Sequence, residues 1–163
     1  MLELGSGLGL CGMVAAHYAS TTVLSDFDPW LVSQISQNLS FNRRSLGNSH
    51  GKAVVLDWDR LDESDILPVD IIVGSEIVHE PNMGIGVFGA IMRFLKKGGS
   101  AFLMLASSQN RFGMEIFLEY LGNSRELVVK SEKIPRQFQA DKLTGLVQED
   151  MNEIWFHNIH RLP

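Results

Sequence analysis

Three alternating glycines follow an acidic residue in the segment Glu3-Leu4-Gly5-Ser6-Gly7-Leu8-Gly9. Glycine tolerates positive φ and leaves the backbone open, so a ligand can contact main-chain N–H groups where a strand turns into a helix. A carboxylate just before the glycines can accept hydrogen bonds or face a cation. The segment therefore predicts a site for a nucleotide-like cofactor that is polar and partly cationic.

Polar residues also follow the next three apolar segments, at Asp26, at Asp57-Trp58 and at Ser75-Glu76. An acid at the first position can hold both hydroxyls of a ribose. An Asp-Trp pair can place a carboxylate near an exocyclic amine and an indole on a purine face. In doubly wound sheets ligands bind at the carboxyl ends of the strands. We therefore expect these side chains to form one pocket for an adenine nucleoside.

Strand-like and helix-like segments alternate along the chain, which predicts a parallel sheet with helices on both faces. The expected strands are 2–4, 21–26, 53–56, 69–74, 100–106, 127–134 and 153–161, and the expected helices are 10–20, 29–42, 82–97 and 112–121. Lys96-Lys97 and Gly98-Gly99 are expected to end the third helix. No helix separates the last two strands, so an antiparallel addition is expected at one edge. Residues 1–163 are expected to form a single domain whose short first strand indicates a truncated N-terminus.

The composition limits the classes of partner and compartment. A net charge of −5 argues against nucleic acid and against anionic membranes, both of which require a basic face. The single cysteine, Cys11, excludes an internal disulfide framework, and no signal-peptide pattern is visible. We expect a cytoplasmic monomer with no metal. Lys96-Lys97 is too short a basic run to read as a nuclear-localisation signal, so a nuclear location is left open.

A set of motifs extends from residue 2 to about residue 106. It comprises residues 2–9, 24–26, 56–58 and 70–81, together with Asn38 and Asn42. In these motifs the sequence resembles the seven-β-strand family-16 methyltransferases, which include protein-lysine methyltransferases. The resemblance implies a Rossmann-like, doubly wound, mostly parallel seven-stranded α/β sheet with an antiparallel C-terminal edge. It also implies use of S-adenosyl-L-methionine and a protein substrate.

The resemblance assigns cofactor contacts to eight residues. They are Gly5, Ser6 and Gly7 for the methionine and ribose portions, Asp26 for the ribose, Trp58 for the adenine, Ser75 beneath the cofactor, and Glu3 and Asp57 as supporting contacts.

Two residues after the fourth strand are expected to be catalytic. Glu76 would bind an arriving ammonium group and orient the neutral amine. The family typically has Asp-x-x-Tyr where this chain has Glu76-Ile77-Val78-His79. An imidazole at His79 can accept a proton near neutral pH, whereas a tyrosine at this position would only form a hydrogen bond.

Two other functions remain open at this stage. Gly7-Leu8-Gly9-Leu10-Cys11-Gly12 is a literal G-x-G-x-x-G, and Asp26 follows at the separation typical of an NAD site, which would indicate an oxidoreductase. The family's N-terminal segment, with its tryptophan, is absent, which would fit an inactive interaction domain. Lysine, histidine and a small molecule all remain open as the methyl acceptor.

Overall fold

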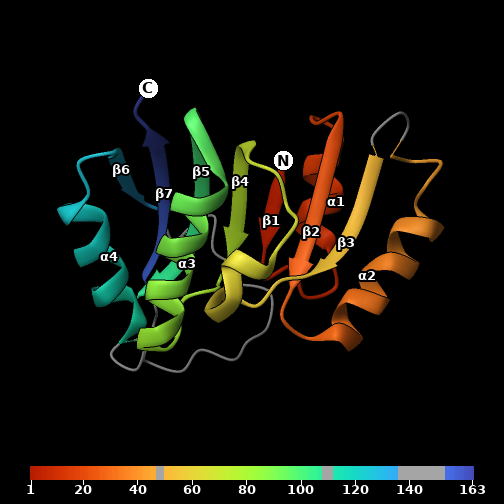
Figure 1. Cartoon of the computed structure of the whole chain (residues 1–163), viewed down its shortest axis with the longest axis horizontal. Coiled ribbons are helices and arrows are strands. Elements are labelled where there is room, and N and C mark those ends of the chain that lie inside the picture. Colours follow the sequence, from red (N-terminus) through yellow and green to blue (C-terminus); the bar gives the residue numbers. More distant parts are fainter. Residues whose placement is uncertain (47–49, 108–111, 136–152) are drawn as a thin grey trace.

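The computed structural model describes residues 1–46, 50–107, 112–135 and 153–163. These residues form one seven-stranded sheet flanked by helices (Figure 1). The elements are β1 (Leu2–Leu4), α1 (Leu10–Ala16), β2 (Thr21–Asp26), α2 (Pro29–Phe41), β3 (His50–Val55), the 3₁₀ helix η1 (Trp58–Glu63), β4 (Val69–Ser75), α3 (Pro81–Phe94), β5 (Leu95–Ser107), α4 (Gly113–Asn123), β6 (Leu127–Lys133) and β7 (Glu153–Arg161).

The strands lie in the order β3-β2-β1-β4-β5-β7-β6. All neighbours from β3 through to β5 are parallel, whereas β7 is antiparallel to both β5 and β6. The predicted α/β architecture, a mostly parallel seven-stranded sheet with an antiparallel C-terminal edge, is confirmed. The strand order reverses direction at β1 and β4, and such a switch point is where doubly wound sheets bind ligands.

Two apolar clusters cover opposite faces of the sheet. Val23 belongs to the larger one, which also contains the buried side chains of α3 and α4, such as Phe94 and Phe117. Its neighbour Leu24 belongs to the smaller one, with Ile35 of α2. Because successive side chains of a strand point to opposite faces, these clusters lie on either side of β2. The sheet is thereby fixed between helices, and its strand ends are held in place.

The third helix ends earlier than the sequence predicted. It stops at Phe94, and Lys96-Lys97 lie in β5 instead of in the last helical turn. The reason is tertiary: Leu95 is buried and pairs with Val69 of β4, which commits the backbone to an extended conformation. Lys96 then pairs with Asp70 across the two strands at 3.0 Å.

Helix α1 also ends early, at Ala16 instead of at residue 20. The segment after β3 was not predicted to be helical, and it forms η1, where the Asp57 carboxylate accepts a 3.0 Å hydrogen bond from the N–H of Asp59. None of the helices in the described ranges is long and apolar enough to cross a membrane.

Candidate active site

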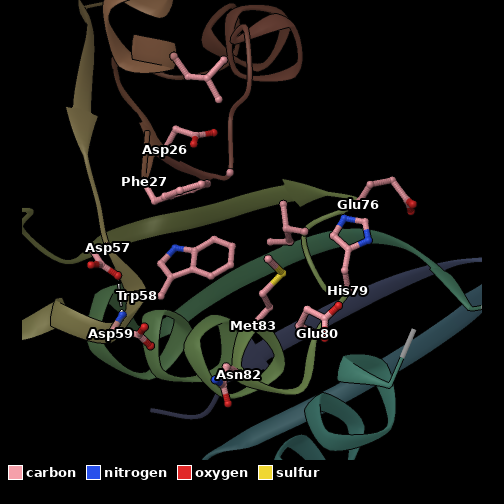
Figure 2. A pocket seen from close by; sticks show the side chains of 13 residues that line it. Asp26, Phe27, Asp57, Trp58, Asp59, Glu76, His79, Glu80, Asn82 and Met83 are labelled. Atoms are coloured by element: carbon pink, nitrogen blue, oxygen red, sulfur yellow. Dashed lines mark hydrogen bonds between the residues drawn. The ribbon is translucent and has the colours of Figure 1, made fainter. Parts of the chain in front are cut away.

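A cavity of about 500 Å³ lies at the carboxyl ends of β1, β2, β3 and β4. Figure 2 shows side chains from the ends of β2, β3 and β4, and from the start of α3, arranged around it, and Gly5 follows β1. The residues that line it are Gly5, Asp26, Phe27, Leu31, Asp57, Trp58, Asp59, Glu76, Ile77, His79, Glu80, Asn82 and Met83. The strand ends that the sequence marked as chemically useful therefore converge on one cavity.

The glycine loop after β1 is held against the end of β2. The N–H of Ser6 donates to the carbonyl of Ser25 at 2.8 Å, and the N–H of Gly7 donates to Oδ2 of Asp26 at 2.9 Å. Gly5 has a φ of +58°, and a Cβ there would lie 2.6 Å from Cγ2 of Ile77, so this position requires glycine. Asp26 both lines the cavity and fixes the loop.

The indole of Trp58 lies between the glycine loop and α3. A Cβ added to Gly5 would lie 3.8 Å from Cη2 of Trp58. A Cβ added to Gly86 of α3 would lie 2.8 Å from Cβ of Trp58. The indole is half-buried, and Figure 2 shows it projecting into the cavity. A flat aromatic face is thus presented to whatever occupies the space.

Glu76 and His79 lie at the end of the cavity opposite to Asp57 (Figure 2). Glu76 is the one non-glycine residue in the described ranges with a positive φ, +55°, and its N–H donates to the carbonyl of Met104 at 2.8 Å. Such backbone strain is stored where the surrounding structure enforces it, often at functional sites. The carbonyl of His79 accepts a 3.2 Å hydrogen bond from the N–H of Gly113, which ties the loop to α4.

Four of the predicted cofactor residues do not line the cavity: Glu3, Ser6, Gly7 and Ser75. Ser6 and Gly7 belong to the loop at its edge, and Ser75 is exposed on β4. Glu3 is buried behind the loop, where a Cβ on Gly12 of α1 would lie 2.3 Å from its Oε2. Burial raises the pKa of the Glu3 carboxyl, although the Ser6 hydroxyl and the Gly12 N–H oppose the rise. The two residues predicted to be catalytic both line the cavity.

The sequence did not single out seven of the lining residues, which are Phe27, Leu31, Asp59, Ile77, Glu80, Asn82 and Met83. Phe27, Asp59 and Ile77 each follow a predicted site residue, and this adjacency was a usable signal. Leu31 and Met83 lie in the first turns of α2 and α3, and only the packing of those helices brings them to the cavity.

The ionisable lining of the cavity is almost entirely acidic. Five carboxylates contribute, from Asp26, Asp57, Asp59, Glu76 and Glu80, whereas no described lysine or arginine does. Opposite charges attract most strongly where water is partly excluded, so this lining favours a cationic ligand. In the described ranges no three histidine, cysteine, aspartate or glutamate side chains come together in a group that could hold a metal ion.

Comparison with known proteins identifies a family. A family described as lysine methyltransferase matches residues 1–123. A calmodulin-lysine N-methyltransferase of Arabidopsis thaliana is 40% identical over 79 residues, which are 47% of this chain and 26% of the relative. A histone-arginine methyltransferase, METTL23 of Xenopus laevis, is 36% identical over 86 residues, 50% of this chain and 35% of the relative. The matched part of the chain thus spans about a quarter to a third of these relatives.

Solved structures share the fold at low sequence identity. An O-methyltransferase from Bacillus cereus in complex with SAH superposes with a TM-score of 0.69 at 12% identity. The likeness covers 98% of this chain and 73% of that protein.

Proposed function

The chain belongs to the lysine methyltransferase family, and on that premise we propose that it transfers the methyl group of S-adenosylmethionine to a lysine side chain of a protein. The observation that carries the proposal is an acidic cavity at the strand ends, which joins Asp26, Trp58 and Glu76. S-adenosylmethionine, when bound, supplies a methyl group on a positively charged sulfur, from which an amine can take it by direct displacement.

The residues present fit this cofactor. Both carboxylate oxygens of Asp26 accept main-chain hydrogen bonds, from Gly7 at 2.9 Å and from Asp28 at 3.3 Å. Each oxygen keeps a further lone pair, so Asp26 can still accept from the hydroxyls of a ribose. The indole of Trp58 offers a surface for the adenine ring. The missing side chain of Gly5 leaves the backbone of the loop open toward the cavity.

The charge of the cavity favours this cofactor over a dinucleotide. The pyrophosphate of NAD is anionic, and it would face carboxylates with no lysine or arginine among the described residues of the lining. The positively charged sulfur and amino group of S-adenosylmethionine suit the same lining. The family match and the cavity therefore both support the methyltransferase function over the oxidoreductase alternative.

The amine of the substrate must lose its extra proton before the transfer, because only a free lone pair attacks carbon. Glu76 would bind the incoming ammonium group, the imidazole of His79 would take its proton as a general base, and Glu76 would orient the neutral amine that results. Holding the amine in line with the methyl group supplies much of the rate of such a displacement. The enforced backbone at Glu76 and the tie from Gly113 to His79 keep both groups in place.

Thermal unfolding with added ligands tests the proposal. A ligand that binds only the folded chain raises its unfolding temperature, so we expect a rise with S-adenosylhomocysteine and none with NAD. No shift with either ligand would favour a noncatalytic interaction domain. Transfer of a radiolabelled methyl group to a protein extract, followed by amino-acid analysis, then separates methyl-lysine from methyl-arginine and methyl-histidine.

A further inference from the structure

Strand β3 forms an edge of the sheet, because β2 is its only neighbouring strand among the described elements. The N–H of His50 donates to Ser20 and that of Leu56 donates to Asp26, so the even-numbered residues direct their main-chain groups toward β2. In a parallel ladder alternate residues point the other way. The N–H and C=O groups of Gly51, Ala53 and Val55 therefore face outward, where no strand of the described chain meets them.

A groove of about 570 Å³ lies beside this edge, between β3 and α2. Leu39 and Leu46 supply apolar surface together with Ala53, while Ser36, Ser40 and Arg43 supply polar groups. A helix beside an unpaired strand edge provides both main-chain hydrogen bonds and pockets for alternate side chains, which is how extended peptides add to sheets. None of the residues of this groove lines the cofactor cavity.

Cationic side chains flank the edge of β3 on both faces of the sheet. Arg43 lines the groove on the α2 face, and it forms no ion pair with a described residue. Ala53 packs against α2, so strand alternation places the side chains of His50 and Lys52 on the opposite face. Both are exposed. Lys52 forms no ion pair with a described residue, although it shares a second hollow with Asp65 and Asp70 on that face. An added strand would present its own side chains to both of these faces.

The second edge of the sheet differs in its charges. Strand β6 carries Lys130, Glu132 and Lys133 in seven residues, and these charges are paired, Lys130 with Glu132 and Lys133 with Glu153. Mixed charges of this kind protect an edge from pairing with other chains. The groove beside β3 is lined by Arg43 and Lys52 and by no described carboxylate, in contrast to the mixed charges along β6.

We propose that the groove between α2 and the outer edge of β3 binds an extended acidic peptide segment of a partner protein, which adds to the sheet as an eighth strand. The free main-chain groups require an extended occupant, and the unpaired cations require acidic side chains. The proposal does not depend on the proposed methyl transfer.

Fluorescence anisotropy with a labelled octapeptide of alternating valine and glutamate tests this proposal, with an alternating valine and lysine octapeptide as the charge control. We expect saturable binding of the acidic peptide only. Arg43→Glu should weaken it by about tenfold or more, because the new charge repels the peptide. Arg44→Glu is the matched control, since Arg44 is exposed but does not line the groove, and it should change affinity less than about twofold.

A second variant tests the strand addition itself. Ala53→Pro removes an outward N–H without breaking the β2 ladder, so it should abolish binding while circular dichroism and S-adenosylhomocysteine binding stay unchanged. Equal binding by Ala53→Pro and wild type would overturn the proposal, as would equal binding by Arg43→Glu. Failure of the acidic peptide to bind, or preferential binding of a single-stranded oligonucleotide, would also overturn it. So would a dimer in sedimentation that Ala53→Pro disrupts, because a second copy would then occupy the edge.

Discussion

The carboxylate of Asp26, at the end of β2, accepts a 2.9 Å hydrogen bond from the main-chain N–H of Gly7, in the loop after β1. This bond joins two neighbouring strand ends at the edge of the cavity. The acid expected to contact the ribose is therefore also the group that fixes the glycine loop. Loss of its charge should act on cofactor binding through both roles.

We expect Asp26→Asn to weaken binding of S-adenosylhomocysteine by about tenfold or more. Asparagine keeps an oxygen that can accept from Gly7, but hydrogen bonds to a charged acceptor contribute about 1.5–3 kcal/mol and the neutral amide loses part of this. Isothermal titration calorimetry measures the change. Asp28→Asn is the matched control, because asparagine also caps α2 as Asp28 does for Trp30, and it should bind like wild type. Equal affinities for all three proteins would refute the ribose assignment.

Gly86→Ala should weaken cofactor binding without touching the cofactor. A Cβ at Gly86 would lie 2.8 Å from Cβ of Trp58, so the new methyl group must shift Trp58 or α3 and thereby change the position of the indole relative to the cavity. We expect a loss of affinity for S-adenosylhomocysteine of about tenfold and a lower unfolding temperature, since overpacking costs about 1–3 kcal/mol.

Gly122→Ala serves as the control for this change. Gly122 also lies in a helix, α4, and a Cβ there would have no atom within 4 Å. Alanine is the better helix former by about 1 kcal/mol, so Gly122→Ala should raise the unfolding temperature and leave cofactor affinity unchanged. A Gly86→Ala protein that binds the cofactor as tightly as wild type would show that the position of the indole is not critical.

The order of elements was predictable because four of the apolar strands, 2–4, 21–26, 69–74 and 100–106, are each followed by a polar turn residue and a helical pattern. The end of α3 was not, because Leu95 leaves the helix to pair with Val69, and such pairing is set by the sheet and not by local propensity. The site followed from the rule that strand ends converge, which places Asp26, Trp58 and Glu76 on one cavity. The rule fixes the edge of the sheet but not side-chain direction, so it could not separate exposed Ser75 from half-buried Glu76.

Replacing Glu76 should separate turnover from binding and from stability. Both Glu76→Ala and Glu76→Gly remove the carboxylate, and we expect both to lose methyl transfer while keeping affinity for S-adenosylhomocysteine. The φ of +55° at this position penalises alanine but not glycine. Glu76→Gly should therefore be more stable than Glu76→Ala by about 1 kcal/mol in denaturant unfolding. Equal stability would show that the backbone relaxes without the carboxylate, and residual turnover would remove Glu76 from the mechanism.

His157 should make the fold sensitive to mild acid. Its side chain is buried on β7, where Nδ1 lies 2.8 Å from the Ser131 hydroxyl, and burial lowers its pKa below the ordinary 6.5. As the pH falls below 6.5, His157 binds a proton in the unfolded chain but stays neutral in the folded chain. The free energy of unfolding therefore falls by up to about 1.4 kcal/mol per pH unit. His157→Gln should flatten the fall of the unfolding temperature between about pH 7 and pH 5. His17→Gln, at an exposed position, should leave it unchanged, and an unaltered profile in His157→Gln would contradict the assignment.

Glu3 should oppose folding at neutral pH. Burial raises the pKa of its carboxyl above the ordinary 4.5, so the folded chain holds the proton more tightly than the unfolded chain does. Stability is therefore lost as the pH rises from 4.5 through the folded pKa, where the carboxylate ionises in a buried setting. Glu3→Gln has nearly the same shape without the charge, and at pH 7 it should unfold roughly 2–4 °C higher, which corresponds to about 1 kcal/mol. This advantage should shrink as the pH falls and the wild-type carboxyl becomes neutral.

Glu119→Gln, on the exposed face of α4, should show no such gain. A Glu3→Gln protein that unfolds below wild type at pH 7 would mean that the N–H of Gly12 and the hydroxyl of Ser6 stabilise the carboxylate by more than its burial costs.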